Sequence, residues 1–135
     1  MAVSEADKTE KITVNLGIVD LGQIDLLVQE GFYANRTDFL RAATRNQLAA
    51  HAEALHRTIA RKTLVLGVQR VTRAELDEHR ASGTKVSIRV LGLATIDPDV
   101  SAELAAATIE AVDVLGAFRA AAGVKAALAD RTAGG

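Results

Sequence analysis

Hydrophobic and polar residues alternate strictly over residues 11–16, near the start of the chain. Two sets of side chains alternate: the apolar Ile12, Val14 and Leu16, and the polar Lys11, Thr13 and Asn15. Successive side chains of an extended segment point to opposite faces, so the two sets lie on opposite sides. The β-branched content favours a strand, and Gly17 ends it. In an arbitrary protein, such a strand is more often a half-buried edge strand whose polar face only meets water.

A helical period follows the predicted strand. The apolar positions of its stripe are spaced by three and four residues: Leu21, Ile24, Leu27 and Val28. Gly31 follows Glu30 and supplies the left-handed residue that commonly ends a helix. We therefore predict a first helix that ends at Glu30 and Gly31.

A second helix is predicted to begin at Asn35, a favoured N-cap residue, with Asp38 three positions later in an arrangement close to a capping box. No Gly or Pro occurs between Asn35 and Lys62, so we expect this helix to continue well past residue 50. One strand and two helices within about 40 residues bury too little apolar surface to be stable alone. The segment is therefore expected to pair with a second copy.

An internal repeat occupies the second half of the chain. The tripeptide Val-Leu-Gly occurs at residues 65–67, 90–92 and 114–116, and helix-like segments follow each copy at residues 73–79, 101–107 and 124–130. A period of about 25 residues with one strand and one helix is typical of a short solenoid with stacked parallel strands. The repeated Gly would permit a bend or a close approach of neighbouring backbones.

These patterns predict an α+β protein with four segments. They are a disordered arm at residues 1–10, a strand-helix-helix domain with an extended second helix at 11–61, three strand-helix repeats at 62–131 and a frayed tail at 132–135. Asp97 and Asp99 flank Pro98 and favour a turn, with Asp99 or Ser101 available to cap the next helix.

The composition of the chain excludes several classes of protein. The 135 residues carry a net charge of −1 and no cysteine, which excludes disulfides and thiolate chemistry. No apolar run approaches the roughly 20 residues of a membrane span, and the polar, acidic start is unlike a signal peptide. We expect a cytoplasmic protein that does not contact a membrane.

Candidate catalytic chemistry is sparse. His51 and His56 are five residues apart, which does not place both imidazoles on one metal ion as a spacing of four could. The serines lie in no nucleophile motif, and the glycines form no phosphate-binding loop. We therefore expect no enzyme, no catalytic residue, no metal site and no cofactor.

Three ordered motifs carry a resemblance. Lys11-Ile-Thr-Val-Asn-Leu, Asp25-Leu-Leu-Val-Gln-Glu-Gly31 and Tyr33-Ala-Asn-Arg-Thr-Asp-Phe-Leu-Arg41 together resemble a ribbon-helix-helix domain of the Arc/MetJ/CopG superfamily. The resemblance covers about 38 residues, from residue 11 to residue 48, which is under a third of the chain. The region after residue 63 also resembles the C-terminal regions of bacterial proteins with such N-termini. This second resemblance implies no function for the region.

The resemblance implies an obligate homodimer whose two strands pair as an antiparallel ribbon in the major groove of double-stranded DNA. Its implied base contacts are Lys11, Thr13 and Asn15. Its implied phosphate contacts lie at the N-terminus of the second helix, at Asn35, Arg36 and Thr37.

Two features depart from the family pattern. Gly17, Ile18 and Val19 stand where relatives often have a proline and acidic residues, and the two apolar residues suggest a junction buried against the repeat region or a partner. Through Lys62 the chain has eight basic and eight acidic residues, so the electrostatic attraction to DNA is small. We expect weak binding by one dimer, helped by several dimers on adjacent sites.

Three functions remain open from the sequence. The first is a sequence-specific transcriptional regulator whose repeats at 62–131 serve oligomerisation, an effector or a protein partner. The second is a non-enzymatic scaffold that uses the ribbon-helix-helix fold only to dimerise. The third is an antitoxin, which the ordered pattern of the second half disfavours, because antitoxins usually carry a disordered tail.

Overall fold

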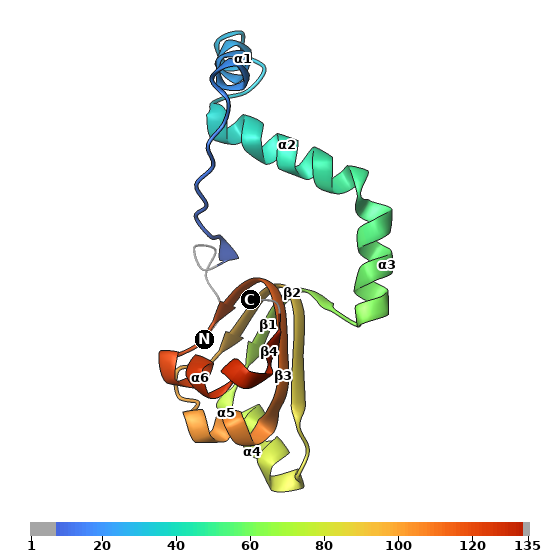
Figure 1. Cartoon of the computed structure of the whole chain (residues 1–135), viewed down its shortest axis with the longest axis vertical. Helices are drawn as coiled ribbons and strands as arrows, with labels where there is room; N and C mark the ends of the chain where they lie inside the picture. Colours follow the sequence, from blue (N-terminus) through green and yellow to red (C-terminus); the bar gives the residue numbers. More distant parts are fainter. Residues whose placement is uncertain (1–7, 134–135) are drawn as a thin grey trace. The chain divides into compact units, whose positions relative to one another are not determined.

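The computed structural model describes residues 8–133 and divides the chain into two compact units. Thr9–Thr58 form one unit, and the other contains the chain from Ile59 onward (Figure 1). Helices and a parallel sheet make an α+β protein, as predicted. Of the predicted arm at residues 1–10, residues 1–7 lie outside the described part of the chain.

The first unit begins with an extended segment followed by helix α1 (Ile18–Gln29). Gly31 has φ of 85° and ends the helix as predicted. Phe32 N–H donates to the Leu27 carbonyl at 2.9 Å, and Gly31 N–H donates to the Val28 carbonyl at 3.1 Å. This pair of bonds satisfies carbonyls that the last turn leaves without a helical partner.

The predicted long second helix is interrupted. Helix α2 (Arg36–Ala50) ends at His51, and helix α3 (Ala52–Lys62) begins directly after it. His51 takes φ of −105° and ψ of 10°, and its N–H donates to the Leu48 carbonyl, three residues back, at 3.1 Å. The prediction that the second helix continues well past residue 50 was wrong, although neither Gly nor Pro marks the break.

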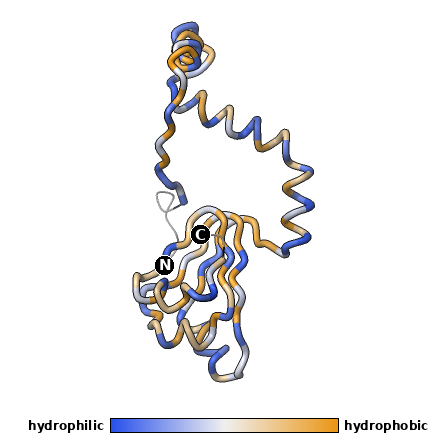
Figure 2. Tube along the Cα trace, viewed as in Figure 1, coloured by the Kyte–Doolittle hydropathy of each residue, from blue (hydrophilic) through white to orange (hydrophobic). Residues whose placement is uncertain are grey.

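The second unit contains a four-stranded sheet in the order β1-β2-β3-β4, with every neighbouring pair parallel. The strands are β1 (Val65–Val71), β2 (Val86–Ile96), β3 (Ile109–Arg119) and β4 (Thr132–Ala133). The three Val-Leu-Gly tripeptides pair residue for residue across β1, β2 and β3. Figure 2 draws these strands largely in the hydrophobic colours.

Helices α4 (Arg73–Ser82), α5 (Ala102–Thr108) and α6 (Ala122–Ala127) connect the strands. They follow one another beside the sheet, and α5 contacts both α4 and α6 (Figure 1). The core between helices and sheet contains the fully buried Leu76, Ile88, Val90, Ala105, Ile109 and Leu128. Of the two predicted cap candidates before α5, the structure uses Ser101, whose hydroxyl accepts from Leu104 N–H at 3.1 Å.

The end of the chain is more ordered than predicted. Thr132 and Ala133 pair with Val112 and Asp113 of β3, so these residues are a short strand rather than a frayed tail. Arg131, in the short 3₁₀ helix η2 (Ala129–Arg131), donates to the carbonyls of Ala106 and Ile109 at 2.9 Å each. Residues 134–135 lie outside the described part of the chain.

The repeated glycines let the strands approach one another. Gly67, Gly92 and Gly116 occupy paired positions and have φ of 127°, 140° and 120°. A Cβ on Gly92 would come closer than 3.0 Å to the Gly67 carbonyl oxygen, and a Cβ on Gly116 equally close to that of Gly92. The second and third glycines are therefore required by the neighbouring strand.

An ion pair ties β1 to the turn after β2. Arg70 Nε and Nη2 donate to the two carboxylate oxygens of Asp97 at 2.8 and 2.7 Å. This double hydrogen bond lowers the pKa of Asp97 below its ordinary value of 3.8. A carboxyl whose pKa falls on folding stabilises the fold above its unfolded pKa, and this contribution disappears as the pH falls through the lowered folded pKa.

We expect Asp97→Asn to lower the melting temperature by a constant amount from about pH 7 to about pH 5, where the natural carboxyl is ionised in both states. Below the ordinary pKa of 3.8 the difference should shrink, because protonation removes the same charge from the natural chain. Thermal unfolding across this pH range measures it. Asp99→Asn is the control, since no hydrogen bond joins Asp99 to Arg70 in the described structure. A difference that stays constant down to about pH 2 would contradict this role for the ion pair.

Candidate nucleic-acid interface

The strand predicted at residues 11–16 is not formed within the described chain, because these residues pair with no other strand, and the side chains on both of their faces are exposed. Lys11, Thr13 and Asn15 are exposed, as a surface that contacts another molecule requires. On the opposite face the exposed fractions are 79% for Ile12, 59% for Val14 and 39% for Leu16. An apolar row of this kind exposed to water marks a surface that another surface covers.

Two open hollows adjoin this apolar row. One, of about 220 Å³, is lined by Val14, Leu16, Leu21, Ile24, Arg36 and Leu40. The other, of about 350 Å³, is lined by Leu16, Asp20, Gln23, Ile24, Leu27, Phe39 and Leu40. Ile24 is the one buried residue of Thr9–Thr58. The core of this unit is therefore incomplete within one chain.

The polar turn before α2 holds the N-terminus of that helix in place. The Asn35 side chain accepts from Asp38 N–H at 2.8 Å, as predicted for the N-cap, and the Asp38 carboxylate accepts from Ala34 N–H at 3.0 Å. Tyr33 and Phe39 pack edge to face beside the turn, with ring centroids 5.1 Å apart. Both sides of the turn are thus fixed to the first residues of the helix.

Backbone N–H groups remain available at this helix end. The N–H groups of Arg36 and Thr37 donate to no acceptor within the described part of the chain. The N-terminus of a helix carries a partial positive charge, and its free N–H groups bind anions such as phosphate. Of the predicted phosphate contacts, the Asn35 side chain serves as the cap, while Arg36 and Thr37 offer backbone donors.

The Arg36 side chain takes part in an ion pair that the sequence pattern did not indicate. Its Nε and Nη2 donate to the two Asp25 carboxylate oxygens at 2.8 Å each, and both side chains are exposed. These hydrogen bonds lower the pKa of Asp25 and raise the pKa of Arg36. The pair links α1 to α2, between residues eleven apart in the sequence.

The ion pair leaves part of the guanidinium group available. A guanidinium has five N–H donors, and Asp25 takes one from Nε and one from Nη2. Both N–H groups of Nη1 and one of Nη2 remain, and one from each nitrogen lies on the edge of the guanidinium away from Nε. Asp25 also neutralises the charge that would attract a phosphate. Arg36 can therefore contact an anion, with its positive charge partly cancelled by Asp25.

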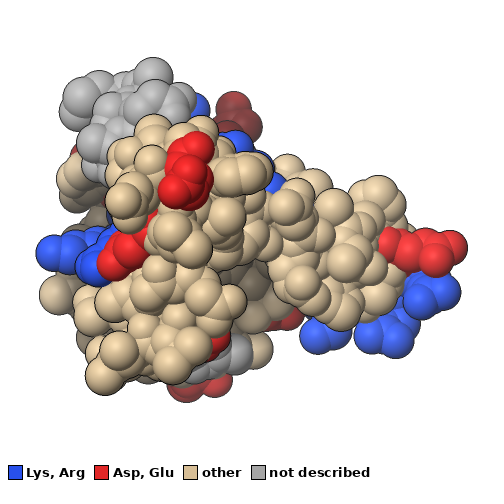
Figure 3. Space-filling model, turned by 90° about the horizontal axis from the view of Figure 1, so that it is seen from above, with Lys and Arg blue, Asp and Glu red and all other residues tan. Residues whose placement is uncertain are grey.

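The wider surface has balanced charge. Thr9–Thr58 contain the basic Lys11, Arg36, Arg41, Arg45 and Arg57, and the acidic Glu10, Asp20, Asp25, Glu30, Asp38 and Glu53. On the face drawn in Figure 3, basic side chains stand beside acidic ones. A protein that depends on phosphate attraction usually presents a concentrated basic surface. This chain instead offers separate basic groups.

The junction between the extended segment and α1 is exposed within the described chain. Ile18 and Val19 are 87% and 75% exposed, so burial of this junction against a partner stays a prediction. They follow Gly17, the N-cap position of α1, which makes no side-chain cap. These two residues enlarge the exposed apolar surface around the segment.

Among the described residues outside this surface, neither a metal site nor a membrane-spanning helix is found. Among residues 8–133, no group of three or more His, Asp or Glu side chains is placed to hold a metal ion. The His79 ring pairs with the Thr84 hydroxyl at 2.7 Å, as a structural histidine does. None of the helices in the described residues has the length and apolar content needed to cross a bilayer.

Comparison with known proteins identifies the family. Residues 7–125 match the model of a family described as the Ribbon-Helix-Helix transcriptional regulator family, and this match extends through both units. No curated protein and no solved structure matches the chain. The match covers most of the sequence and confirms the resemblance seen in residues 11–48. The chain belongs to the Ribbon-Helix-Helix transcriptional regulator family.

Proposed function

We propose that the chain is a sequence-specific DNA-binding regulator that acts as a homodimer. Residues 11–16 of two copies pair as an antiparallel ribbon and enter the major groove. One observation carries the proposal: an extended segment without a strand neighbour lies beside an apolar hollow that its own chain leaves open. A second copy supplies both the missing strand and the missing cover. No catalytic residue takes part.

Dimerisation follows from the apolar surface of the first unit. Ile12, Val14 and Leu16 face the helices once two segments pair, and the hollows beside Ile24 and Leu40 are filled from the partner. Burial of apolar surface contributes roughly 25 cal/mol for each Å² removed from water. The exposed apolar row thereby becomes the main stabilising element of the dimer.

Base recognition falls to the opposite face of the ribbon. The major groove is wide enough for a two-stranded ribbon, and its base edges present distinct donors and acceptors. Lys11 can donate to guanine acceptors, Asn15 can pair with adenine through two hydrogen bonds, and Thr13 can bond to a base or contact a thymine methyl. Each appears twice in a dimer, so the preferred site has two-fold symmetry.

Phosphate contacts would fix the position of the ribbon. The free N–H groups of Arg36 and Thr37 would bind a backbone phosphate at the start of α2, and the remaining donors of Arg36 would add a second contact. The Asn35 side chain shapes this site by capping the helix. Because so few cations are available, single dimers bind weakly and adjacent dimers reinforce one another.

A gel-retardation assay on the DNA upstream of the protein's own gene tests the proposal. Specific retardation that excess unrelated DNA does not compete away is expected. We further expect Asp25→Asn to strengthen binding, because it releases Arg36 and removes two negative charges from each dimer. The salt dependence should become steeper, as each additional phosphate contact releases bound counterions.

Glu30→Gln, at the exposed C-terminal end of α1, is the matched control for Asp25→Asn, since it removes the same negative charge while the Asp25–Arg36 pair stays in place. Absence of specific retardation would argue against DNA recognition. If Asp25→Asn leaves the affinity and its salt dependence unchanged, this result would argue only against the phosphate contact of Arg36 and not against DNA recognition.

A scaffold is the second candidate. The balanced charge of Thr9–Thr58 favours it, because a domain that only dimerises needs no basic surface. A scaffold function predicts that light scattering detects stable assemblies and that the protein binds no DNA fragment in preference to another. The retardation assay separates the two functions.

A further inference from the structure

A hollow lies beside strand β3 in the second unit, and no residue of Thr9–Thr58 lines it. It has a volume of about 470 Å³ and opens between β3 and the segment that contains α6, η2 and β4. Its lining residues are Val112, Val114, Gly116, Phe118, Lys125, Ala129, Thr132 and Ala133. A volume of this size is typical of pockets that bind small molecules.

The repeat pattern shows which apolar side chains the hollow leaves uncovered. Val114 and Phe118 of β3 are paired with Val90 and Ala94 of β2. Val90 and Ala94 are completely buried, whereas Val114 and Phe118 pack against the same core and remain half-buried. One row of the sheet is thus fully covered in the middle strand and partly open in β3. An apolar group placed in the hollow would complete this cover.

Small residues keep the hollow open on the side that faces β3. The larger residues of the last segment, Val124 and Leu128, are buried in the core. Ala129 and Ala133 line the hollow, and their side chains end at Cβ. Neither is long enough to fill the space in front of β3. The hollow therefore lies between a wall fixed by the core and a wall of small side chains.

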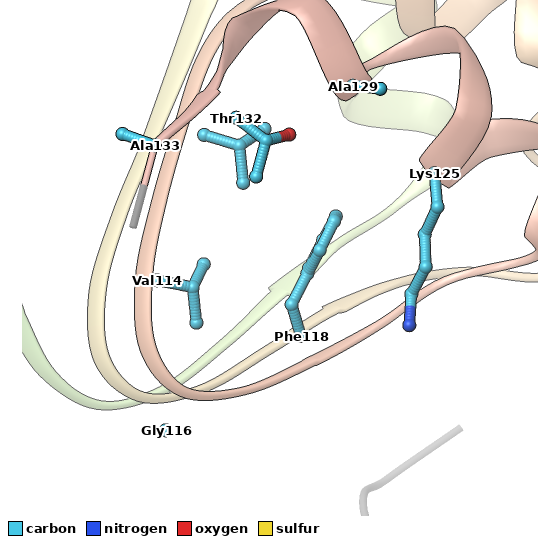
Figure 4. A pocket seen from close by; sticks show the side chains of 8 residues that line it. Val114, Gly116, Phe118, Lys125, Ala129, Thr132 and Ala133 are labelled. Atoms are coloured by element: carbon cyan, nitrogen blue, oxygen red, sulfur yellow. The ribbon is translucent and has the colours of Figure 1, made fainter. Parts of the chain in front are cut away.

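One charged side chain lies at the hollow. Of the described residues that line it, Lys125 alone carries a charge. Lys125 Nζ lies 5.8 Å from the centre of the Phe118 ring, and no carboxylate of residues 8–133 forms an ion pair with it. Figure 4 shows Val114 and Phe118 directed into the hollow, with Lys125 extended alongside Phe118. An ammonium group without a carboxylate partner beside an apolar surface is complementary to a ligand that carries a negative charge.

The Thr132 hydroxyl restricts which anion fits. It donates its hydrogen to the Leu128 carbonyl at 2.8 Å, so it offers a ligand only acceptor lone pairs. Lys125 is therefore the donor among the side chains that line the hollow. Phosphate groups are commonly held by several donors, often by the paired N–H groups of arginine. A single ammonium suits a carboxylate better.

We propose that this hollow binds a small carboxylate with an apolar body, of the kind found in medium-chain fatty acids. The carboxylate pairs with Lys125, while the apolar body lies against Val114 and Phe118 and over Gly116. The ligand then covers the row of β3 that its own chain leaves half-buried. The site does not depend on the proposed recognition of DNA, so either proposal can fail while the other holds.

Calorimetric titration of the full-length chain with octanoate tests the proposal. Octanoate is expected to bind, and octanamide, which has the same length without the charge, should bind at least about tenfold more weakly. Each methylene removed from the chain, in the series from octanoate through hexanoate to butyrate, should weaken binding about fourfold. Absence of octanoate binding, or octanamide binding as tightly as octanoate, would overturn the proposal.

Lys125→Met tests the role of the ammonium group. The substitution removes the charge and keeps an apolar side chain beside Phe118. The affinity for octanoate should fall at least about tenfold, whereas the affinity for octanamide should stay the same. Lys85→Met is the control, because Lys85 is an exposed lysine of the same unit outside the hollow. Equal losses for octanoate and octanamide would contradict the pairing of the carboxylate with Lys125.

Ala129→Leu tests the location of the ligand. The larger side chain takes up part of the hollow, so octanoate binding should fall at least about tenfold. Ala126→Leu, at an exposed residue of α6 that does not line the hollow, is the control and should bind as the natural chain does. The far-ultraviolet circular dichroism of each variant shows whether the sheet is intact.

The apolar hollows beside Ile24 are the alternative place for octanoate on this chain. Octanoate binding that persists unchanged in Lys125→Met and Ala129→Leu would place the ligand outside the hollow of β3 and overturn the proposal. If Ala129→Leu does not fold, the comparison of octanoate with octanamide in the natural chain and in Lys125→Met decides between the two sites.

Discussion

Replacing Gly92 by alanine is expected to destabilise the second unit strongly. The new Cβ would overlap the Gly67 carbonyl oxygen, which belongs to backbone and cannot rotate away. The φ of 140° adds strain of about 1–3 kcal/mol for a residue with a side chain. With the overlap included, we expect a loss of about 4 kcal/mol or more, in the range of severe single substitutions.

Gly67→Ala separates the two causes of this loss. It introduces comparable strain at φ of 127° without an overlap in its own chain. Thermal unfolding followed by circular dichroism at low concentration, where copies do not assemble, should show a loss of only about 1–3 kcal/mol. Gly22→Ala, in helix α1 with open space around it, should stabilise by about 0.5–1 kcal/mol. Equal losses for Gly92→Ala and Gly67→Ala would show that strand spacing does not require the glycine.

Asn15→Ala is expected to weaken specific DNA binding by at least about 30-fold, because a dimer loses two contacts of about 1–3 kcal/mol each. Affinity for unrelated DNA should change little, since Asn15 carries no charge. Lys11→Ala should instead reduce affinity for both specific and unrelated DNA, because it removes a base contact and a positive charge. Titration of each variant with matched specific and unrelated duplexes measures both effects.

Gln47→Ala, on the exposed surface of α2 outside the proposed interface, is the control. Neither Lys11 nor Asn15 supports the fold through burial, so melting temperatures should stay close to that of the natural chain. If Asn15→Ala leaves the ratio of the affinity for specific DNA to the affinity for unrelated DNA unchanged, Asn15 is not one of the base contacts.

Local patterns in the sequence predicted what depends on local chemistry. Gly31 ends α1 because only a residue without a Cβ takes its positive φ without strain, and Asn35 caps α2 because its side chain reaches Asp38 N–H. The repeated Val-Leu-Gly predicted stacked parallel strands, and in the structure the three tripeptides pair in register. These features appear in the structure at the expected residues.

Features set by contacts between distant residues were missed. The Asp25–Arg36 pair depends on how α1 and α2 pack, and no spacing rule relates residues in two helices. Strand β4 has two residues, too few for any alternation to show. The break at His51 carries no Gly or Pro signal, and Ile18 and Val19 look like core residues although the described chain leaves them exposed. In each case the deciding contact lies outside the local pattern.

The most direct test of ribbon-mediated DNA recognition is selection of DNA from the protein's own genome. Sheared genomic fragments are retained by the purified full-length chain and sequenced, in parallel with Asn15→Ala at the same salt concentration. The natural chain is predicted to enrich a small set of fragments that share a site with two-fold symmetry, and Asn15→Ala is predicted to lose that enrichment. Equal recovery of all fragments by the natural chain, or the same enriched fragments with Asn15→Ala, would contradict recognition of DNA through the ribbon.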